Sequence, residues 1–210
     1  MTLYIPQHFR MDDEGAIDAL IRENAFGTLV SSGPAGLSVS HIPFVVARGA
    51  GGLRLLGHVA RANEHWKALE SATHTVAIFE GPHAYVSPTW YAAQPSVPTW
   101  NYAVVHAHGR ASLMDEFELR DLLGTLSATY EEGRPNPWRL ADQPSQYLEG
   151  MVANIVGFAL EVERVESKFK LSQNRPAEVP RVIAALEAEG ETALAALMRT
   201  HALARGKIPA

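Results

Sequence analysis

The stretch TWNYAVVHAHGRASL at residues 99–113 is the longest strand that the sequence predicts. Successive side chains of a strand point to opposite faces. One face therefore carries Asn101, Ala103, Val105 and Ala107. The other face carries Trp100, Tyr102, Val104, His106 and His108. A long strand with two different faces favours the wall of a barrel.

Further strands are predicted on both sides of this stretch from alternating or continuous apolar runs bounded by Gly and Pro. They span residues 26–32, 37–47, 53–60, 75–80, 84–87 and 156–170. The Gly-rich segments 33–36 and 49–52 predict turns, and the Pro-rich segment 88–98 predicts a loop. Most of the strands precede residue 113 and one follows late, which favours a small, mostly antiparallel barrel.

Helices are predicted where apolar residues recur at helical spacing or where a capping residue precedes them. The first follows the acidic residues Asp12, Asp13 and Glu14 and carries Ile17, Leu20 and Ile21. The others span residues 63–69, 115–131, 146–154, 178–188 and 191–204, with Phe117 in the apolar stripe of the third. The predicted fold class is therefore mostly β with peripheral helices (α+β).

Composition excludes several classes of protein. The 210 residues are 47% hydrophobic and 20% charged, which does not fit a disordered chain. The absence of cysteine excludes disulfides, thiolate metal sites and cysteine nucleophiles. The net charge of -5 and the scattered cations argue against a dedicated nucleic-acid binder, and the densest basic stretch, residues 199–207, is short. No apolar run is long enough for a membrane span and no secretory signal is evident, so we expect a cytoplasmic protein.

Residues 57–67, GHVARANEHWK, predict a strand that ends beside a helix start. Arg61, Asn63 and Lys67 lie around that start, where backbone N–H groups and two cations could converge on one phosphate. The alternative is an ordinary strand-to-helix turn with Trp66 packed and the cations in solvent.

Two later segments also suggest ligand contacts. In residues 97–102, VPTWNY, aromatic side chains could stack on a planar ring while Asn101 bonds its polar edge; the alternative is a core strand with a buried Trp. In residues 166–174, ESKFKLSQN, two lysines on one strand face precede three polar side chains; the alternative is a solvated edge strand guarded by lysines.

Nine histidines raise the question of a metal. His106 and His108 share a strand face, yet no third ligand is near in sequence and no HExxH pattern occurs, so no metal site is predicted. The patterns of a nucleophile elbow, a Rossmann turn and a P-loop are also missing from the sequence.

Seven segments, taken in order, resemble the Pai-type FMN-binding negative transcriptional regulator family. They are YIPQHF at 4–9, FGTLV at 26–30, SHIPF at 40–44, GHVARAN at 57–63, FEGPHAYVSP at 79–88, PTWNY at 98–102 and KFKLSQN at 168–174. The resemblance covers most of residues 1–175. It implies an FMN-binding split β-barrel similar to that of pyridoxamine phosphate oxidases, and a homodimer with FMN at or near the subunit interface.

The resemblance also implies which residues bind the cofactor. Arg61 and Lys67 would bind the phosphate, assisted by the helix start at Asn63. The isoalloxazine would be lined by Ser40, His41, Pro43, His58 and Ala60. Trp100, Asn101 and Tyr102, from the same or from the partner subunit, would close the other side. Lys170, Ser172 and Gln173 are further candidates, and no catalytic residue is identified.

On this basis residues 1–175 are predicted to form the flavin-binding domain and residues 176–210 a helical segment. The resemblance implies a flavin-dependent negative regulator of transcription. Binding to DNA is possible on this basis, but neither the charge nor any motif of the sequence supports it. The alternative is a flavin-dependent oxidoreductase acting on a small molecule, so the sequence does not decide whether the protein is an enzyme. A third alternative is a haem-binding split-barrel protein.

Overall fold

The computed structural model describes residues 3–34, 36–49, 51–204 and 206. Ala35 and Ala50, in the two predicted Gly-rich turns, lie outside the described residues, as does Lys207 at the end of the basic stretch.

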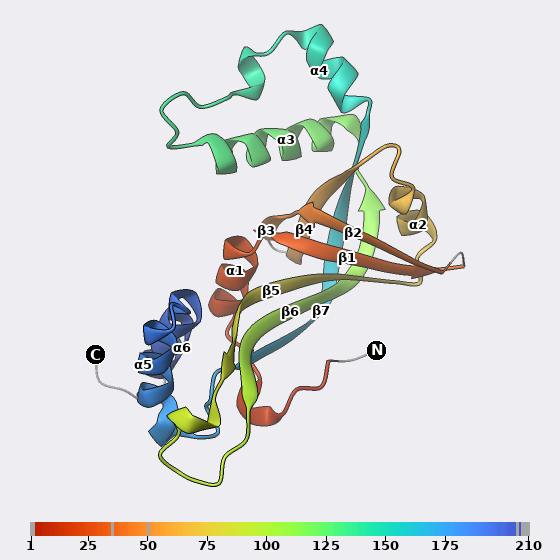
Figure 1. Cartoon of the computed structure of the whole chain (residues 1–210). Coiled ribbons are helices and arrows are strands. Elements are labelled where there is room, and N and C mark those ends of the chain that lie inside the picture. Colours follow the sequence, from red (N-terminus) through yellow and green to blue (C-terminus); the bar gives the residue numbers. More distant parts are fainter. Residues whose placement is uncertain (1–2, 35, 50, 205, 207–210) are drawn as a thin grey trace. The chain divides into compact units, whose positions relative to one another are not determined.

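Seven strands form one sheet in the order β2-β1-β5-β6-β7-β4-β3 (Figure 1). The strands are β1 (Phe26–Gly33), β2 (Gly36–Pro43), β3 (Val45–Gly49), β4 (Gly52–Ala60), β5 (His74–Val86), β6 (Thr99–Leu113) and β7 (Ile155–Lys170). Strand β1 pairs antiparallel with β2 and β5, and β4 pairs antiparallel with β3 and β7.

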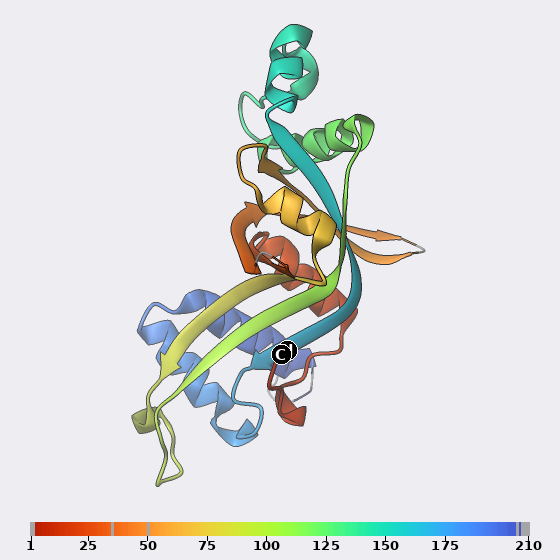
Figure 2. The same ribbon diagram turned by 90° about the vertical axis from the view of Figure 1, so that its right-hand side faces the viewer.

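Six α-helices accompany the described part of the sheet. They are α1 (Glu14–Glu23), α2 (His65–Ser71), α3 (Glu116–Glu131), α4 (Ser145–Val152), α5 (Val179–Ala188) and α6 (Thr192–Ala204). Short 3-10 turns occur at Gln7–Phe9, Pro88–Trp90, Leu140–Asp142 and Pro176–Glu178. Helices α5 and α6 pack side by side, in blue in Figure 2. The predicted α+β class is confirmed.

Phe44 explains why the sheet curls. It is the one residue between β2 and β3, which stand at opposite ends of the strand order. Two end strands joined by a single residue require the sheet to bend back on itself, as in a barrel. The ring of Phe44 is buried against Phe79 and Phe158, with ring centroids 5.2 and 6.2 Å apart. The single strand predicted for residues 37–47 is therefore wrong: Phe44 donates its N–H to Ala25 instead of a ladder partner.

The two short strands predicted around Gly81 and Pro82 are also one strand, β5. The strand accommodates glycine at position 81 because the interior there is crowded. A Cβ at Gly81 would lie 2.9 Å from Leu20 Cδ1. Pro82 is tolerated because pairing of β1 with β5 ends at Ile78, so its missing N–H interrupts no bond to β1.

Strand β6 has the predicted bounds and the predicted division into two faces, and the structure shows which face is buried. Asn101, Ala103, Val105 and Ala107 are each at most 2% exposed. Gly109 continues this inner face where β6 meets β7, and a Cβ there would lie only 1.9 Å from the carbonyl oxygen of Glu161. Glycine thus permits the close approach of the two strands.

Helix α3 begins as its sequence predicts. Asp115 accepts the N–H of Glu118, and Glu118 accepts the N–H of Asp115, which forms a capping box. Leu119, Leu122 and Leu126 are buried, but Phe117 is 81% exposed and its assignment to the apolar stripe is wrong.

Contacts divide the chain into two compact units. Unit 1 comprises residues 1–20, 80–105 and 166–210, and unit 2 comprises residues 21–79 and 106–165. Strands β5, β6 and β7 contribute residues to both. The predicted division into a split-barrel FMN-binding domain, residues 1–175, and a C-terminal helical segment, residues 176–210, stays a prediction. Across the described helices, none is long and apolar enough to cross a membrane.

Candidate functional site

A buried polar network in unit 2 joins β1, β2, β5 and the start of α2. The two ring nitrogens of His65 contact the hydroxyls of Ser40 at 2.8 Å and Ser31 at 3.1 Å. Asn63 Nδ2 donates to Ser40 Oγ at 3.0 Å, and Ser31 Oγ contacts Thr75 Oγ1 at 3.1 Å. Because each nitrogen of the buried ring has a partner, this network holds the turn after β4 against the sheet.

Asn63 also supports the first turn of α2, as predicted. Its Oδ1 accepts the N–H of His65 at 3.1 Å. The structure thus brings together two of the predicted cofactor-binding residues, Ser40 and Asn63.

The two cations of this turn already have partners. Arg61 is exposed and donates from Nε to the carbonyl of Ala153 at 2.7 Å and from Nη2 to that of Ile155 at 3.1 Å. Lys67 pairs with Glu64 at 2.7 Å. A guanidinium has further N–H groups to offer, so Arg61 could still bind a phosphate oxygen while anchored to the backbone.

The remaining unit 2 candidates lie on β2 and β4. His41 points outward and its Nδ1 contacts Thr28 Oγ1 at 3.0 Å. Pro43 and Ala60 stand at the ends of their strands. His58 Nδ1 is buried without a hydrogen-bond partner among the described residues. Burial lowers the pKa of both His58 and His65 below the ordinary value, which favours neutral rings.

Unit 1 presents an aromatic surface on β5 and β6. Trp100 is 54% exposed, and its ring centroid lies 6.4 Å from that of His83 and 6.3 Å from that of Tyr85. A cavity of about 380 Å³ is lined by His83, Trp100 and Tyr102 among others. The alternative of a buried core Trp is therefore wrong, and the side chains available for stacking face outward. We call Trp100, Tyr102 and His83 the aromatic wall.

Lys168 places a positive charge beside this wall. Its Nζ lies 5.3 Å from the ring centroid of Tyr102 and 5.4 Å from that of Tyr4. Lys168 is buried, and its strand β7 lies between β6 and β4 in the sheet. The alternative of a solvated edge strand guarded by lysines is therefore wrong.

Asn101 points to the opposite face from Trp100 and Tyr102. It is 1% exposed, and its Nδ2 donates to Ser172 Oγ at 2.9 Å. Lys170 donates to Thr99 Oγ1 and to the carbonyl of Trp100. The structure thus groups Asn101, Lys170 and Ser172 together, away from the outward side chains of the aromatic wall.

Gln173 serves the bend after β7. Its Oε1 accepts the N–H of Leu171 at 2.7 Å and its Nε2 donates to the carbonyl of Phe169. Its amide is therefore engaged by the local backbone.

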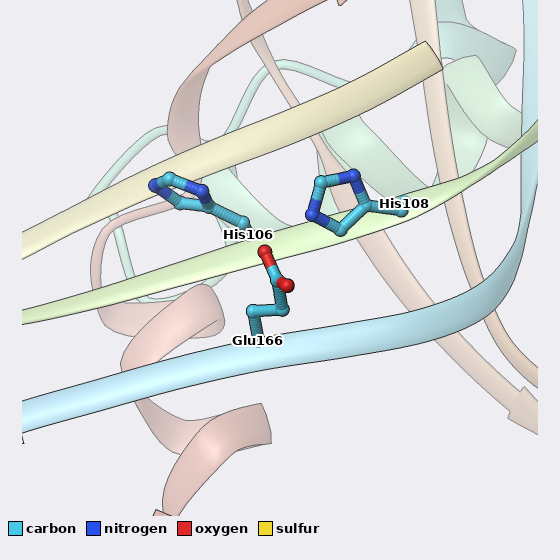
Figure 3. A group of neighbouring side chains, drawn as sticks. All are labelled: His106, His108 and Glu166. Atoms are coloured by element: carbon cyan, nitrogen blue, oxygen red, sulfur yellow. The ribbon is translucent and has the colours of Figure 1, made fainter. Parts of the chain in front are cut away.

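His106 and His108 both stand on β6, and Figure 3 draws them with Glu166 of β7. Their ring centroids are 6.2 Å apart. His108 Nδ1 contacts His74 Nε2 at 3.0 Å, so one nitrogen of this ring is shared with another histidine.

The sequence did not indicate several residues of the polar network in unit 2 and of the surfaces around the aromatic wall in unit 1. His65 was visible only as a polar residue in a helix start, and its contacts to Ser31 and Ser40 come from other strands. His83 was quoted in a motif but given no role, although it lines the aromatic cavity. Arg175 follows a polar run and lies 4.9 Å from the ring centroid of Tyr91, a contact across the chain that no local pattern indicates.

A curled antiparallel sheet with an outward aromatic wall and nearby cations defines a candidate flavin-binding protein. Residues 3–164 match the family FMN_bind_2, described as "Putative FMN-binding domain". The chain belongs to this family, which identifies FMN as its cofactor.

The chain is 35% identical over 173 residues to "Protease synthase and sporulation protein PAI 2" of Bacillus subtilis. That match covers 82% of this chain and 83% of the relative. The predicted resemblance to the Pai-type family is thereby confirmed.

Solved structures share the fold at low identity. The "FAD and Heme binding protein" of Mycobacterium smegmatis has a TM-score of 0.58 at 15% identity, covering 77% of this chain and 73% of that one. The "Flavocytochrome Anf3" of Azotobacter vinelandii has a TM-score of 0.57 at 16% identity, covering 79% and 72%. These matches agree with the predicted split β-barrel.

The residues present fit FMN chemically. An isoalloxazine requires a flat, largely apolar wall with a few polar groups, and the aromatic wall with Lys168 provides one in unit 1. A phosphate requires cations and N–H donors, and Arg61 with Lys67 provides them in unit 2.

Proposed function

We propose that this protein is a homodimeric FMN-binding regulator that lowers the expression of target genes, with the flavin ring against the aromatic wall. The observation that supports it most is the outward exposure of Trp100 beside His83 and Tyr102. A large exposed aromatic side chain that lines a cavity is typical of a ligand surface.

Bound FMN supplies the electron or hydride transfer chemistry. The chain's own contribution is to orient and tune the ring. Trp100 and Tyr102 offer stacking faces, and the ammonium of Lys168 favours negative charge near them.

The predicted contacts remain part of this proposal. Arg61, Asn63 and Lys67 would bind the phosphate of FMN. The ring edge would lie near Ser40, His41, Pro43, His58 and Ala60, with Asn101, Lys170, Ser172 and Gln173 behind the aromatic wall.

An exposed apolar face on β1 and β2 supports the homodimer. Phe26, Leu37 and Val39 are exposed, and the strand register sets Val39 opposite Val30 and Leu37 opposite Ser32. On this face Leu37 and Val39 lie next to Val30, whereas the pair Thr28 and His41 separates them from Phe26. Exposed apolar side chains on a sheet face are typical of an interface. We propose that this face pairs two subunits of a cytoplasmic dimer, and that residues 176–210 support the dimer. Light scattering after size-exclusion chromatography should give twice the chain mass, and Val39→Asp should reduce it to one chain mass.

The regulatory part of the proposal is supported by the name of the Bacillus relative, which refers to protease synthesis and sporulation. A gel-shift series with upstream DNA, with and without FMN and across salt concentrations, tests it. Direct regulation predicts a complex that weakens with salt and changes with FMN. If no DNA complex forms in either state, direct binding to DNA is rejected.

The second candidate function is a flavin-dependent oxidoreductase for a small molecule. The net charge of -5 favours it over DNA binding. Turnover of NADH or NADPH by the FMN-loaded protein would support it. The third candidate is a haem-binding protein, which the name of the FAD and Heme binding protein of Mycobacterium smegmatis suggests. The absorption spectrum of the purified protein separates flavin from haem.

A further inference from the structure

A second pocket lies in unit 1, on the inner side of β6. Its volume is about 120 Å³, and its lining includes Asn101, Lys170, Ser172 and Arg175. This volume equals roughly four water molecules. The pocket is therefore large enough for one small ion and far too small for a flavin ring.

The charge of this pocket is positive. Lys170 and Arg175 line it, and none of its described lining residues carries a carboxylate. The nearby carboxylate of Glu178 accepts the N–H groups of Ala92 and Ala93, both at 3.0 Å, and offsets part of the charge of Arg175, so Lys170 carries most of the net positive charge. Two cations in a concave, partly dehydrated pocket attract an anion more strongly than they would in water.

Both cations are held in place by the protein. Arg175 stacks on Tyr91 and donates from Nη1 to Ser96 Oγ at 2.8 Å. Lys170 donates to Thr99 Oγ1 and to the carbonyl of Trp100. Burial, and to a smaller degree the charge of Lys168, lower the pKa of the Lys170 ammonium. An anion in the pocket would relieve this electrostatic cost.

Asn101 supplies an unused acceptor in the same lining. Its Oδ1 is buried and has no hydrogen-bond partner among the described residues, whereas its Nδ2 donates to Ser172. A buried acceptor without a donor is rare and costly. Ser172, the partner of Asn101, has a φ of 63° in the left-handed region, a conformation that is uncommon for a non-glycine residue.

We propose that this pocket binds a small oxyanion that carries an O–H group, of which hydrogen phosphate is the simplest. Lys170 and Arg175 would bind the charged oxygens, and Asn101 would accept the O–H. The pocket is a separate site from the flavin phosphate contacts proposed at Arg61 and Lys67.

Thermal unfolding of the flavin-free protein tests the proposal. At constant ionic strength, about 50 mM phosphate should raise the unfolding midpoint by roughly 3 °C. Sulfate has the same shape but carries no O–H near neutral pH, so it should raise the midpoint less. An equal effect of the two ions would overturn the assignment of Asn101 as acceptor.

Two arginine variants localise the effect. Arg175→Gln should abolish the phosphate shift. Arg181→Gln is the control, because Arg181 donates to the carbonyl of Trp90 and does not belong to the lining. A shift that persists in Arg175→Gln, or that is absent in the wild-type protein, would overturn the proposal.

A competition experiment identifies the source of the phosphate. The competition is measured in the wild-type protein and in Arg175→Gln, because phosphate can also compete with FMN at Arg61 and Lys67. If the pocket holds a separate ion, any weakening of FMN by phosphate relative to riboflavin, which lacks the phosphate, should be the same in the two proteins. A competition against FMN that Arg175→Gln abolishes would overturn the separate site and assign the pocket to the cofactor. Flavin binding can succeed or fail independently of the phosphate shift, so the two proposals are tested separately.

Discussion

Two buried polar groups, one in each unit, differ in how completely they satisfy their own hydrogen bonds. In unit 2, both nitrogens of His65 have hydroxyl partners. In unit 1, Asn101 keeps an unpartnered oxygen and two cations line the pocket beside it. A closed network stabilises a fold, whereas an open one retains capacity for a ligand. The contrast predicts that the network around His65 contributes more to stability than the side chain of Asn101 does.

The largest effect should come from opening the closed network. His65→Leu removes one hydrogen-bond partner each from Ser31 and Ser40, which keep Thr75 and Asn63, and should lower the free energy of unfolding by about 2–4 kcal/mol. Asn101→Leu in the flavin-free protein should cost less than about 1 kcal/mol, because its amide is already half unsatisfied. Urea unfolding of both variants measures the difference. Equal losses would remove the distinction between the two groups.

The aromatic wall should dominate the binding of the flavin ring. Trp100→Ala should weaken FMN roughly thirtyfold, as expected for the loss of about 2 kcal/mol of stacking. Trp138→Ala is the matched control, because Trp138 is a comparably exposed Trp on the segment between α3 and α4. Flavin fluorescence titration gives both affinities. Similar losses in the two variants would exclude the wall as the ring site.

Arg61 should affect the phosphate and not the ring. Arg61→Ala should weaken FMN roughly tenfold and leave riboflavin unchanged, because the lost contact is a charge-assisted one at an exposed site. The variant also loses two bonds to the backbone of residues 153 and 155, so its fold must be checked by circular dichroism. A parallel loss of riboflavin binding would assign Arg61 a structural role instead.

The smallest effect should appear in the dependence of stability on pH. Burial lowers the pKa of His58 and His65 in the folded state, so the unfolded chain binds protons first as the pH falls. This contribution to stability is complete above the ordinary value of 6.5 and is lost as the pH decreases below it. Urea unfolding at several pH values should show the loss, and His65→Gln should reduce its slope. An unchanged slope would mean that His65 does not contribute.

Regular alternation made much of the fold predictable. Strand β6 was predicted with its bounds and its two faces, because side chains alternate along a strand. Which of the two faces is buried became clear only from the structure. Glycine and proline indicated where a strand could be interrupted, but not whether it is. The break at Phe44 and the continuity through Gly81 and Pro82 depend on contacts with Phe79, Phe158 and Leu20, which are distant in sequence.

The candidate site was predictable to a smaller degree. Trp100 and Asn101 are neighbours in sequence, and strand alternation alone sends them to opposite faces. The pocket beside Asn101 could not be predicted, because Lys170, Ser172 and Arg175 reach it from a bend after β7.

The central claim is that the flavin ring lies against the aromatic wall of unit 1. A crystal structure of the FMN complex tests it most directly. We expect the isoalloxazine in stacking contact with Trp100 or Tyr102 and near Lys168. A ring bound elsewhere, with Trp100 and Tyr102 in contact with solvent, would contradict the account.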